Sequence, residues 1–216
     1  MQRPRLRTTL CALGLLSLLG AGCRSTYYSM WETFGKEKRD LLKDQVEAAR
    51  DGQKKASEQF KDALTRLKEM YAVRGGDLEN AYGKLKADYE RSESRAKEVR
   101  ERIVKVERVA GDLFAEWRKE IQTYSSASLR ASSQKRLDET QTKYQSLLAA
   151  MKKAERGMEP VLVQFRDQVL YLKHNLNALA IGSLKGEASE IEKEINALIK
   201  DMQKSIAEAD SFIGAL

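Results

Sequence analysis

Residues 42–70 have the sequence LKDQVEAARDGQKKASEQFKDALTRLKEM, in which apolar or small side chains recur at alternating steps of four and three. The positions that follow this rule are Leu42, Val46, Ala49, Gln53, Ala56, Phe60, Ala63, Leu67 and Met70. An average period of 3.5 residues is typical of helices that pack along the seam of a left-handed coiled coil. Residues 42–70 therefore predict a long amphipathic helix with one buried seam.

Apolar residues recur with a similar spacing in three further segments. A second helix is predicted over residues 78–117, a third over 137–179 and a fourth over 184–212. The third segment carries the extra apolar residues Leu162, Val169 and Leu170, which predict a wider buried face. The fourth seam comprises Leu184, Ala188, Ile191, Ile195, Leu198, Met202, Ile206, Ala209 and Phe212.

Glycine and serine mark where these helices break. Arg74-Gly75-Gly76-Asp77 offers two residues that tolerate positive φ, followed by an aspartate suited to cap the next helix. The serine-rich residues 123–133 and the segment Ile181-Gly182-Ser183 predict the other two turns. Pro160 lies inside the third segment, but the seam stays in phase across it, which predicts a kink and not an end.

The composition agrees with long helices. Of the 216 residues, 33% are charged, 7% are aromatic and only 2 are proline, a balance typical of charged helices and not of sandwich or α/β folds. Short connections make consecutive helices antiparallel neighbours. We therefore predict an all-α fold: an elongated antiparallel coiled coil forming one up-down-up-down four-helix bundle over residues 34–216. Its two middle helices would each be roughly 65–75 Å long.

The first 22 residues have the three parts of an export signal. Arg3, Arg5 and Arg7 form a basic start without any acid, residues 10–19 are apolar, and residues 20–22 are small. The apolar run is too short to span a bilayer, which needs about 20 apolar residues. These features predict a signal peptide over residues 1–22.

Residues 19–23, Leu-Gly-Ala-Gly-Cys, resemble the lipobox of bacterial lipoproteins, although Gly20 stands where leucine is usual. In that family the signal is cut before the cysteine, which is acylated on its sulfur and its new amino group, so the resemblance implies lipidation of Cys23. Several acyl chains hold a protein on a membrane stably, whereas one binds marginally, at ~0.8 kcal/mol per buried CH2. Arg24 replaces the aspartate that marks inner-membrane retention in enterobacterial lipoproteins, which favours an outer-membrane lipoprotein facing the periplasm. An ordinary secretory signal cut near Gly22 and an uncleaved anchor are the alternatives.

Residues 23–33 would form a lipid-anchored tether rich in aromatic side chains. Tyr27, Tyr28 and Trp31 lie close to the lipidated cysteine in the sequence. Tyrosine and tryptophan favour the interface between a membrane and water. We therefore treat these three as candidate interaction residues, with capping of the bundle end as the alternative.

The helical segments lack the patterns that catalysis or metal binding requires. His174 is the only histidine, and both cysteines, Cys11 and Cys23, precede the predicted helices. The sequence contains no zinc-ligand spacing, nucleophile elbow or phosphate-binding loop. We predict a protein that is not an enzyme and takes no cofactor, metal or small-molecule substrate.

His174, Asn175 and Asn177 form the most distinctive polar stretch of the third segment. A buried asparagine in a coiled-coil seam can fix helix register or oligomeric state. These three are further candidate interaction residues, with a ligand contact as the alternative to a register role.

The formal net charge of +7 falls to +4 once the predicted signal is removed, because 36 basic and 32 acidic side chains remain. Basic and acidic residues alternate along the chain, whereas nucleic-acid binders gather basic residues on one face, so we expect no nucleic-acid partner. The basic cluster of Lys36, Lys38 and Arg39 supports an alternative function, salt-sensitive binding of the cell wall or another polyanion.

Three segments resemble an uncharacterised bacterial domain-of-unknown-function family of helical, lipoprotein-like envelope proteins. They are YYSMWETFGKEKRD at residues 27–40, MEPVL at 158–162 and LKHNLNA at 172–178. The resemblance spans roughly residues 24–216 and implies the fold and the envelope location, but no functional residues. We expect a structural or interaction module that is anchored to the membrane by lipid and binds a protein partner or a second copy of itself.

Overall fold

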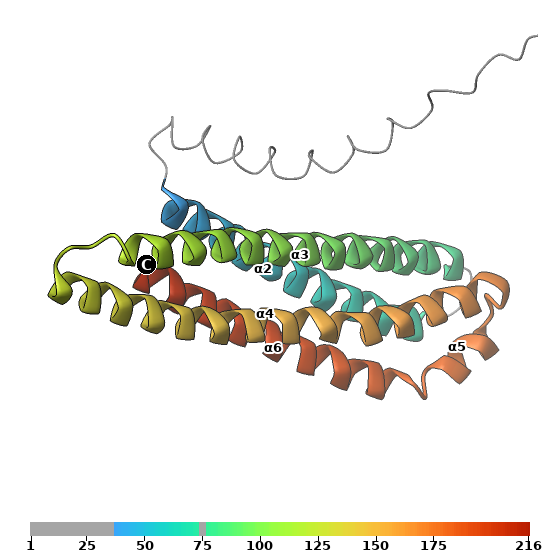
Figure 1. The fold of residues 1–216 in the computed structure, drawn as a ribbon. Helices are drawn as coiled ribbons and strands as arrows, with labels where there is room; N and C mark the ends of the chain where they lie inside the picture. Colours follow the sequence, from blue (N-terminus) through green and yellow to red (C-terminus); the bar gives the residue numbers. More distant parts are fainter. Residues whose placement is uncertain (1–36, 74–76) are drawn as a thin grey trace, which may run out of the picture.

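The computed structural model describes residues 37–73 and 77–216. The predicted signal peptide, Cys23, and the aromatic residues Tyr27, Tyr28 and Trp31 lie outside the described residues. The described ranges contain five helices and no strand (Figure 1): α2 Lys38–Ala72, α3 Leu78–Ile121, α4 Ala127–His174, α5 Ala178–Leu184 and α6 Ala188–Ala215.

The four long helices form a closed ring. Helix α2 packs against α3 and α6, and α4 packs against the same two helices, so each long helix has two antiparallel neighbours. The short helix α5 turns the chain between α4 and α6. The prediction of an all-α, up-down-up-down bundle is confirmed. With 44 and 48 residues, α3 and α4 are about 66 and 72 Å long.

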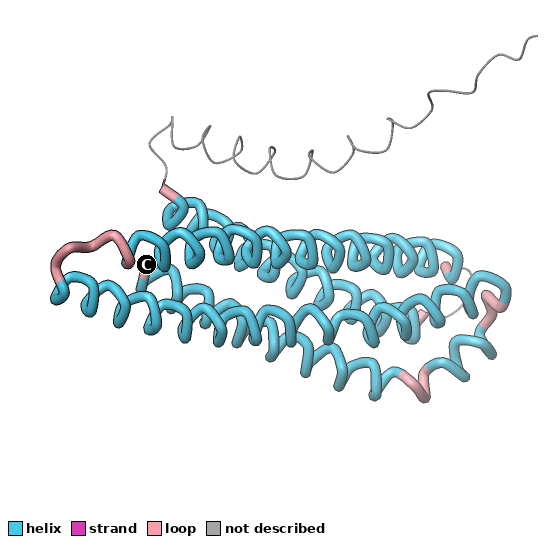
Figure 2. The backbone as a smooth tube through the Cα atoms, in the orientation of Figure 1, coloured by secondary structure: helices cyan, strands magenta, loops and turns pink. Residues whose placement is uncertain are grey.

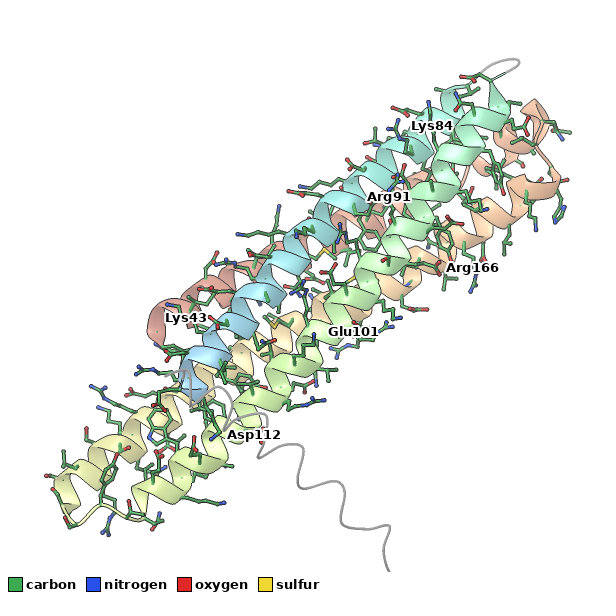
Figure 3. All side chains as sticks on the ribbon, turned by 90° about the horizontal axis from the view of Figure 1, so that it is seen from above. Lys43, Lys84, Arg91, Glu101, Asp112 and Arg166 are labelled. Carbon is green, nitrogen blue, oxygen red and sulfur yellow. The ribbon has the colours of Figure 1, made fainter. Side chains whose placement is uncertain are left out.

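The seam predicted for the first helix is buried throughout. All nine positions from Leu42 to Met70 are at most 1% exposed, because the 3.5-residue period keeps them on the side of α2 that faces the other helices. The outer faces carry charged side chains, among them Lys43, Lys84 and Glu101 (Figure 3). Ion pairs align the neighbouring helices: Arg50 Nη1 lies 2.8 Å from Asp210 Oδ1, and Lys68 Nζ lies 2.6 Å from Glu192 Oε1.

One predicted seam position in α6 is wrong. The prediction placed Ile206 in the seam because it is apolar, but the structure buries Ser205 completely and leaves Ile206 only half-buried. The step from Met202 to Ser205 is three residues and the next step, to Ala209, is four. The alternation of the helix therefore continues, and position within the period outweighs hydrophobicity.

The end of the third predicted helix is also different. We expected its seam to reach Leu179 and the break to fall at residues 181–183, but α4 ends at His174 and α5 covers residues 178–184. Leu179 is 86% exposed. The reason is local: Asn177 Oδ1 accepts a hydrogen bond from the Ala180 backbone N–H at 2.9 Å and so caps a new helix. In the wider apolar face predicted for the third helix, Leu170 is 52% exposed and only Leu162 and Val169 are buried.

The other two predicted breaks are confirmed in place but differ in detail. The serine-rich turn is shorter than expected, because α3 extends to Ile121 and α4 begins at Ala127, so residues 127–133 are helical. Helix α3 begins at Leu78, so Asp77 occupies the N-cap position. Its side chain caps no backbone N–H and instead accepts a hydrogen bond from the Asn80 side chain at 3.2 Å. Helix α4 continues through Pro160 without ending, as the unbroken seam indicated.

Helices α3 and α4 are longer than their partners, with consequences at one end of the bundle. Their hairpin projects past the start of α2 and the end of α6, and the loop that joins them lies at the far tip (Figure 2). We call residues 117–137 the α3–α4 overhang. Within it, Ile121 and Leu137 are each 1% exposed, and the Trp117 indole N–H donates to Ser133 Oγ at 2.9 Å. These contacts hold the two helices together beyond the ring.

Candidate interaction site

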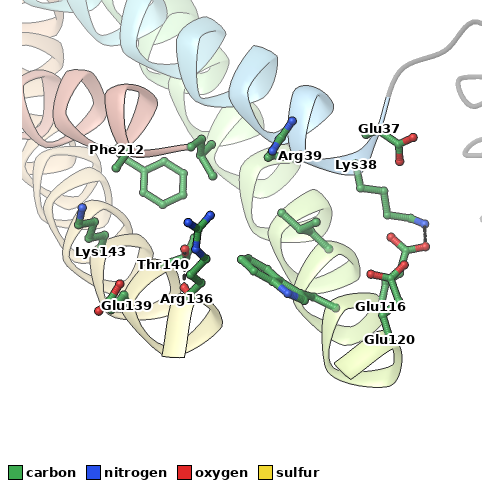
Figure 4. Close-up of a pocket in the computed structure, with 14 residues that line it drawn as sticks. Glu37, Lys38, Arg39, Glu116, Glu120, Arg136, Glu139, Thr140, Lys143 and Phe212 are labelled. Atoms are coloured by element: carbon green, nitrogen blue, oxygen red, sulfur yellow. Dashed lines mark hydrogen bonds and ion pairs between the residues drawn. The ribbon is translucent and has the colours of Figure 1, made fainter. Parts of the chain in front are cut away.

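A cleft of about 610 Å³ lies where α2 begins and α6 ends, against the base of the overhang (Figure 4). It exists because α2 and α6 stop here while α3 and α4 continue, so one side of the hairpin has no helix to cover it. We call it the end cleft. Its lining consists of Glu37, Lys38, Arg39, Leu113, Glu116, Trp117, Glu120, Arg136, Glu139, Thr140, Lys143, Phe212, Ala215 and Leu216.

Aromatic packing supports the apolar floor of the end cleft. Phe212 is 2% exposed, and its ring centroid lies 6.2 Å from that of Tyr144, which in turn meets Phe114 edge-to-face at 5.4 Å. Such tilted and edge-on pairs are favourable beyond the area they bury. Burial of Tyr144 and the nearby charge of Glu107 raise the pKa of its phenol to about 12. The floor is therefore rigid and built by three of the long helices.

The rim of the end cleft is charged but balanced. Four acids (Glu37, Glu116, Glu120, Glu139) and four bases (Lys38, Arg39, Arg136, Lys143) line the opening. Glu37, Glu116 and Glu120 lie with Lys38 on one side, and Glu139 lies with Arg136 and Lys143 on the other (Figure 4). Lys38 Nζ donates to Glu116 Oε1, which joins the first residue of α2 to α3. An apolar floor with a rim of both signs suits a protein surface better than a polyanion, because protein interfaces have an apolar core and a polar rim.

Only two of the three residues in the basic cluster behind the polyanion hypothesis lie in the described part of the chain. Lys36 lies outside the described residues. The Lys38 side chain is 13% exposed and is engaged with Glu116, so it adds little to an outward-facing positive patch. Arg39 remains at the cleft rim.

The second group of candidate residues lies at the opposite end of the bundle, and its expected burial is wrong. His174, Asn175 and Asn177 are all exposed. Asn175 Nδ2 donates to the Tyr171 carbonyl at 3.0 Å, and Asn177 caps α5, so both asparagines shape the turn between helices. They do not set register within the seam. A contact of these residues with a partner stays a prediction, and the structure does not bring them to the end cleft.

The sequence analysis did not predict two clusters of buried polar side chains. Asp88 is 3% exposed, and its carboxylate is met by Arg66, Arg91 and the Gln59 amide. No sequence signal singles it out, because alternating steps of four and three from Leu78 lead to its neighbour Tyr89 and not to Asp88. Two cations and an amide offset the cost of burying this charge, so the cluster joins α2 to α3.

The second cluster joins α2, α4 and the start of α6. The Tyr71 hydroxyl donates to Gln168 Oε1 at 3.1 Å, and Gln168 Nε2 donates to Glu187 Oε2 at 2.8 Å. Burial, followed by the charge of Glu187, raises the pKa of the Tyr71 phenol. Alternating steps of three and four from Leu137 lead to Gln168, so the sequence predicts its place in the seam, but its partners depend on the tertiary fold.

Neither a metal centre nor a membrane span is found within the described ranges. No three His, Cys, Asp or Glu side chains among residues 37–73 and 77–216 converge as ligands for a metal ion. None of the helices in that part of the chain combines the length and the apolar character needed to cross a bilayer.

These observations define a class: an elongated, closed four-helix bundle with one overhanging hairpin and a cleft at its base. The chain belongs to the family described as Protein of unknown function (DUF2959), whose model matches residues 27–216. The resemblance to a domain-of-unknown-function family is thus confirmed, whereas the bacterial origin and the lipoprotein-like character of its members stay predictions. Neither the curated proteins nor the solved structures include a significant match.

Proposed function

We propose that this protein is a non-catalytic interaction module of the cell envelope, held on a membrane by lipid at Cys23 and binding a protein partner at the end cleft. The anchoring rests on the signal-like residues 1–22 and the lipobox-like residues 19–23. Arg24, in place of the aspartate that marks inner-membrane retention in enterobacterial lipoproteins, favours the outer membrane, with the bundle in the periplasm.

The observation that carries the binding role is the uncovered base of the α3–α4 overhang. At the end cleft the apolar side chains are less completely covered than elsewhere in the ring. Trp117 and Leu216 are only partly buried and line an opening of about 610 Å³, beside Leu113 and Phe212, which are 9% and 2% exposed. Buried aromatic anchors within a polar rim are the usual core of a protein interface. A segment from a partner or from a second copy of the chain would cover this floor.

The anchoring is tested by mass spectrometry of the mature N-terminus from membrane fractions, with Cys23→Ala as the comparison. We expect an acylated Cys23 in the wild type, and loss of both acylation and membrane association in the variant. An unmodified chain that begins at Met1 in the cytosol would overturn the export and the anchoring together.

The binding role is tested by photo-crosslinking in intact cells. A photoreactive residue replaces Lys143, which is exposed at the rim of the end cleft, and in a control chain it replaces Lys173, which is exposed at the opposite end. We expect one protein adduct of defined mass from position 143 and none from position 173. Absence of an adduct at 143, or the same adducts from both positions, would count against the end cleft as a binding site.

A further inference from the structure

We propose that the α3–α4 overhang is a second membrane contact, which binds the anionic headgroups of the bilayer that carries the lipid anchor. This inference rests on the proposed anchoring, because the anchor determines which end of the bundle lies near the membrane. It adds a surface that orients the bundle, whereas lipid on Cys23 alone would leave the bundle free to tilt.

The first observation is the charge of the overhang. Residues 117–137 contain five basic side chains and one acid, Glu120, a net charge of +4. The basic residues are Arg118, Lys119, Arg130, Lys135 and Arg136, all of them exposed. Residues 23–216 as a whole also carry +4, so the rest of that span sums to zero and the excess positive charge lies within residues 117–137. Acids flank this segment at Glu116, Asp138 and Glu139, and Lys135 Nζ lies 3.9 Å from Glu139 Oε1, so the positive surface is that of the tip beyond them.

The second observation is the apolar character of the same tip. Leu129 is 60% exposed and Tyr124 is 36% exposed, both beside the loop between α3 and α4. Arg130 Nη2 donates to the Tyr124 carbonyl at 2.6 Å, which holds the loop against the first turn of α4. An exposed leucine and tyrosine among basic residues suit the interface of an anionic bilayer, where aromatic rings sit at headgroup level and lysine or arginine meets phosphate.

The third observation is the position of the overhang relative to the point where the chain enters the bundle. The ion pair between Lys38 and Glu116 places the first turn of α2 against α3 one residue before the overhang begins. From Glu116 to the loop at Gln122 is about 9 Å of helix. Cys23 and Glu37 are separated by 13 residues, which can span at most about 50 Å. The covalent length therefore allows the lipid and the tip to reach one membrane surface together.

The opposite end of the bundle provides a matched comparison. It exposes Leu179 to 86%, more than Leu129, so an exposed leucine alone does not distinguish the two ends. It also exposes Lys173 and Lys185, and the exposed acid Glu187 lies two residues after Lys185 in the sequence. A contact driven only by apolar surface would favour Leu179, whereas a contact driven by charge and anchor position favours Leu129.

The experiment uses the mature protein, purified from membranes and reconstituted in vesicles of phosphatidylcholine with or without phosphatidylglycerol. Leu129→Cys and, as the control, Leu179→Cys are labelled with an environment-sensitive fluorophore. Lipids that carry a nitroxide in the acyl chain act as quenchers. The parent chain, treated identically, reports any labelling at Cys23.

We expect a blue shift and quenching at position 129 in vesicles with phosphatidylglycerol, loss of both at high salt, and neither at position 179. Lys119→Gln combined with Lys135→Gln should lower the fraction of molecules whose overhang contacts the membrane. The equilibrium constant for that contact should fall about 30-fold. The same change at Lys173 and Lys185 should have no effect. Equal signals at 129 and 179, no signal at 129, or a signal that ignores phosphatidylglycerol would each overturn the proposal.

Mass spectrometry of the same preparation separates this inference from the anchor. An acylated Cys23 without quenching at position 129 refutes the tip contact and leaves the anchoring intact. Quenching at position 129 of a chain without acylation supports the tip contact and refutes the anchoring.

Discussion

Gln53 and Gln168 are both buried in the bundle, but only Gln168 has hydrogen-bond partners. The same substitution at the two positions should therefore change the free energy of unfolding in opposite directions. Gln53 is 0% exposed, and neither its side-chain nitrogen nor its oxygen has a hydrogen-bond partner among the described residues. Gln168 is 2% exposed and bonds to Tyr71 and Glu187. Methionine has nearly the shape of glutamine without its amide, so Gln53→Met and Gln168→Met change polarity at almost constant volume.

The magnitudes follow from the hydrogen bonds. A buried polar group left without a partner costs about 1–3 kcal/mol, and Gln53→Met removes two such atoms. We therefore expect Gln53→Met to raise the free energy of unfolding by about 1–3 kcal/mol. Gln168→Met removes an acceptor from Tyr71 and a donor from Glu187, so it should lower the free energy of unfolding by about 1–3 kcal/mol.

Thermal and urea unfolding followed by circular dichroism measure both variants. For a chain of this size, each kcal/mol shifts the Tm by about 2–4 °C, so the two variants should lie on opposite sides of the wild type. A destabilised Gln53→Met would refute the assignment of Gln53 as unpaired and would indicate a buried water at this level of the core. A neutral Gln168→Met would show that its two bonds add nothing beyond packing.

Three further predictions concern helix interiors and pH. A methyl group added at Gly111 would meet no other atom within 4 Å, so Gly111→Ala should stabilise the protein by about 0.5–1 kcal/mol in urea unfolding. At Gly52 a Cβ would lie 2.8 Å from Arg102 Cδ, so Gly52→Ala should stabilise the protein less. Equal stabilisation by the two substitutions would contradict this contact. Phe165→Ala should cost about 3–5 kcal/mol in the same assay, since this ring is 0% exposed, and a loss below about 1 kcal/mol would contradict its burial. The pKa of Tyr144 is raised to about 12 from its usual 10, so its neutral form stabilises the fold fully below pH 10, and this stability is lost as the pH rises from 10 through 12. Tyr144→Phe should therefore flatten the fall of Tm between about pH 9 and 11.5, and an unchanged slope would exclude this phenol as a source of the fall.

The seam of α2 could be predicted in full because one rule, alternating steps of four and three, determines which side of a coiled-coil helix is buried. The same rule, applied strictly, identifies Ser205 in α6. The prediction failed at Ile206 because hydrophobicity was allowed to override the period. Hydrophobic patterns also fail at the end of α4. Leu179 remains in phase with the seam while two asparagines turn the chain, and the strict step of three from Leu172 falls on Asn175 and not on the apolar Leu176.

The end cleft could be predicted only in part. Unequal distances between the breaks in the sequence imply helices of unequal length, and hence an overhang at one end. The contacts that shape the cleft, such as Lys38 with Glu116 and Trp117 with Ser133, join residues far apart in the chain. They depend on the relative shift of neighbouring helices, which a single seam does not determine. The charge of the overhang was present in the sequence but became visible only once residues 117–137 were seen to stand beyond the ring.

The contacts of α2 with both of its neighbours in the ring have a mechanical consequence. A pull between Glu37 and the opposite end of the bundle would act parallel to the axes of all four long helices. Helix α2 is bonded along its length to both neighbours, to α6 by Arg50–Asp210 and Lys68–Glu192, and to α3 by Lys38–Glu116 and Gln59–Asp88. Such a load shears these contacts all at once and does not break them one after another. The bundle would therefore resist extension between the start of α2 and a partner bound at its opposite end.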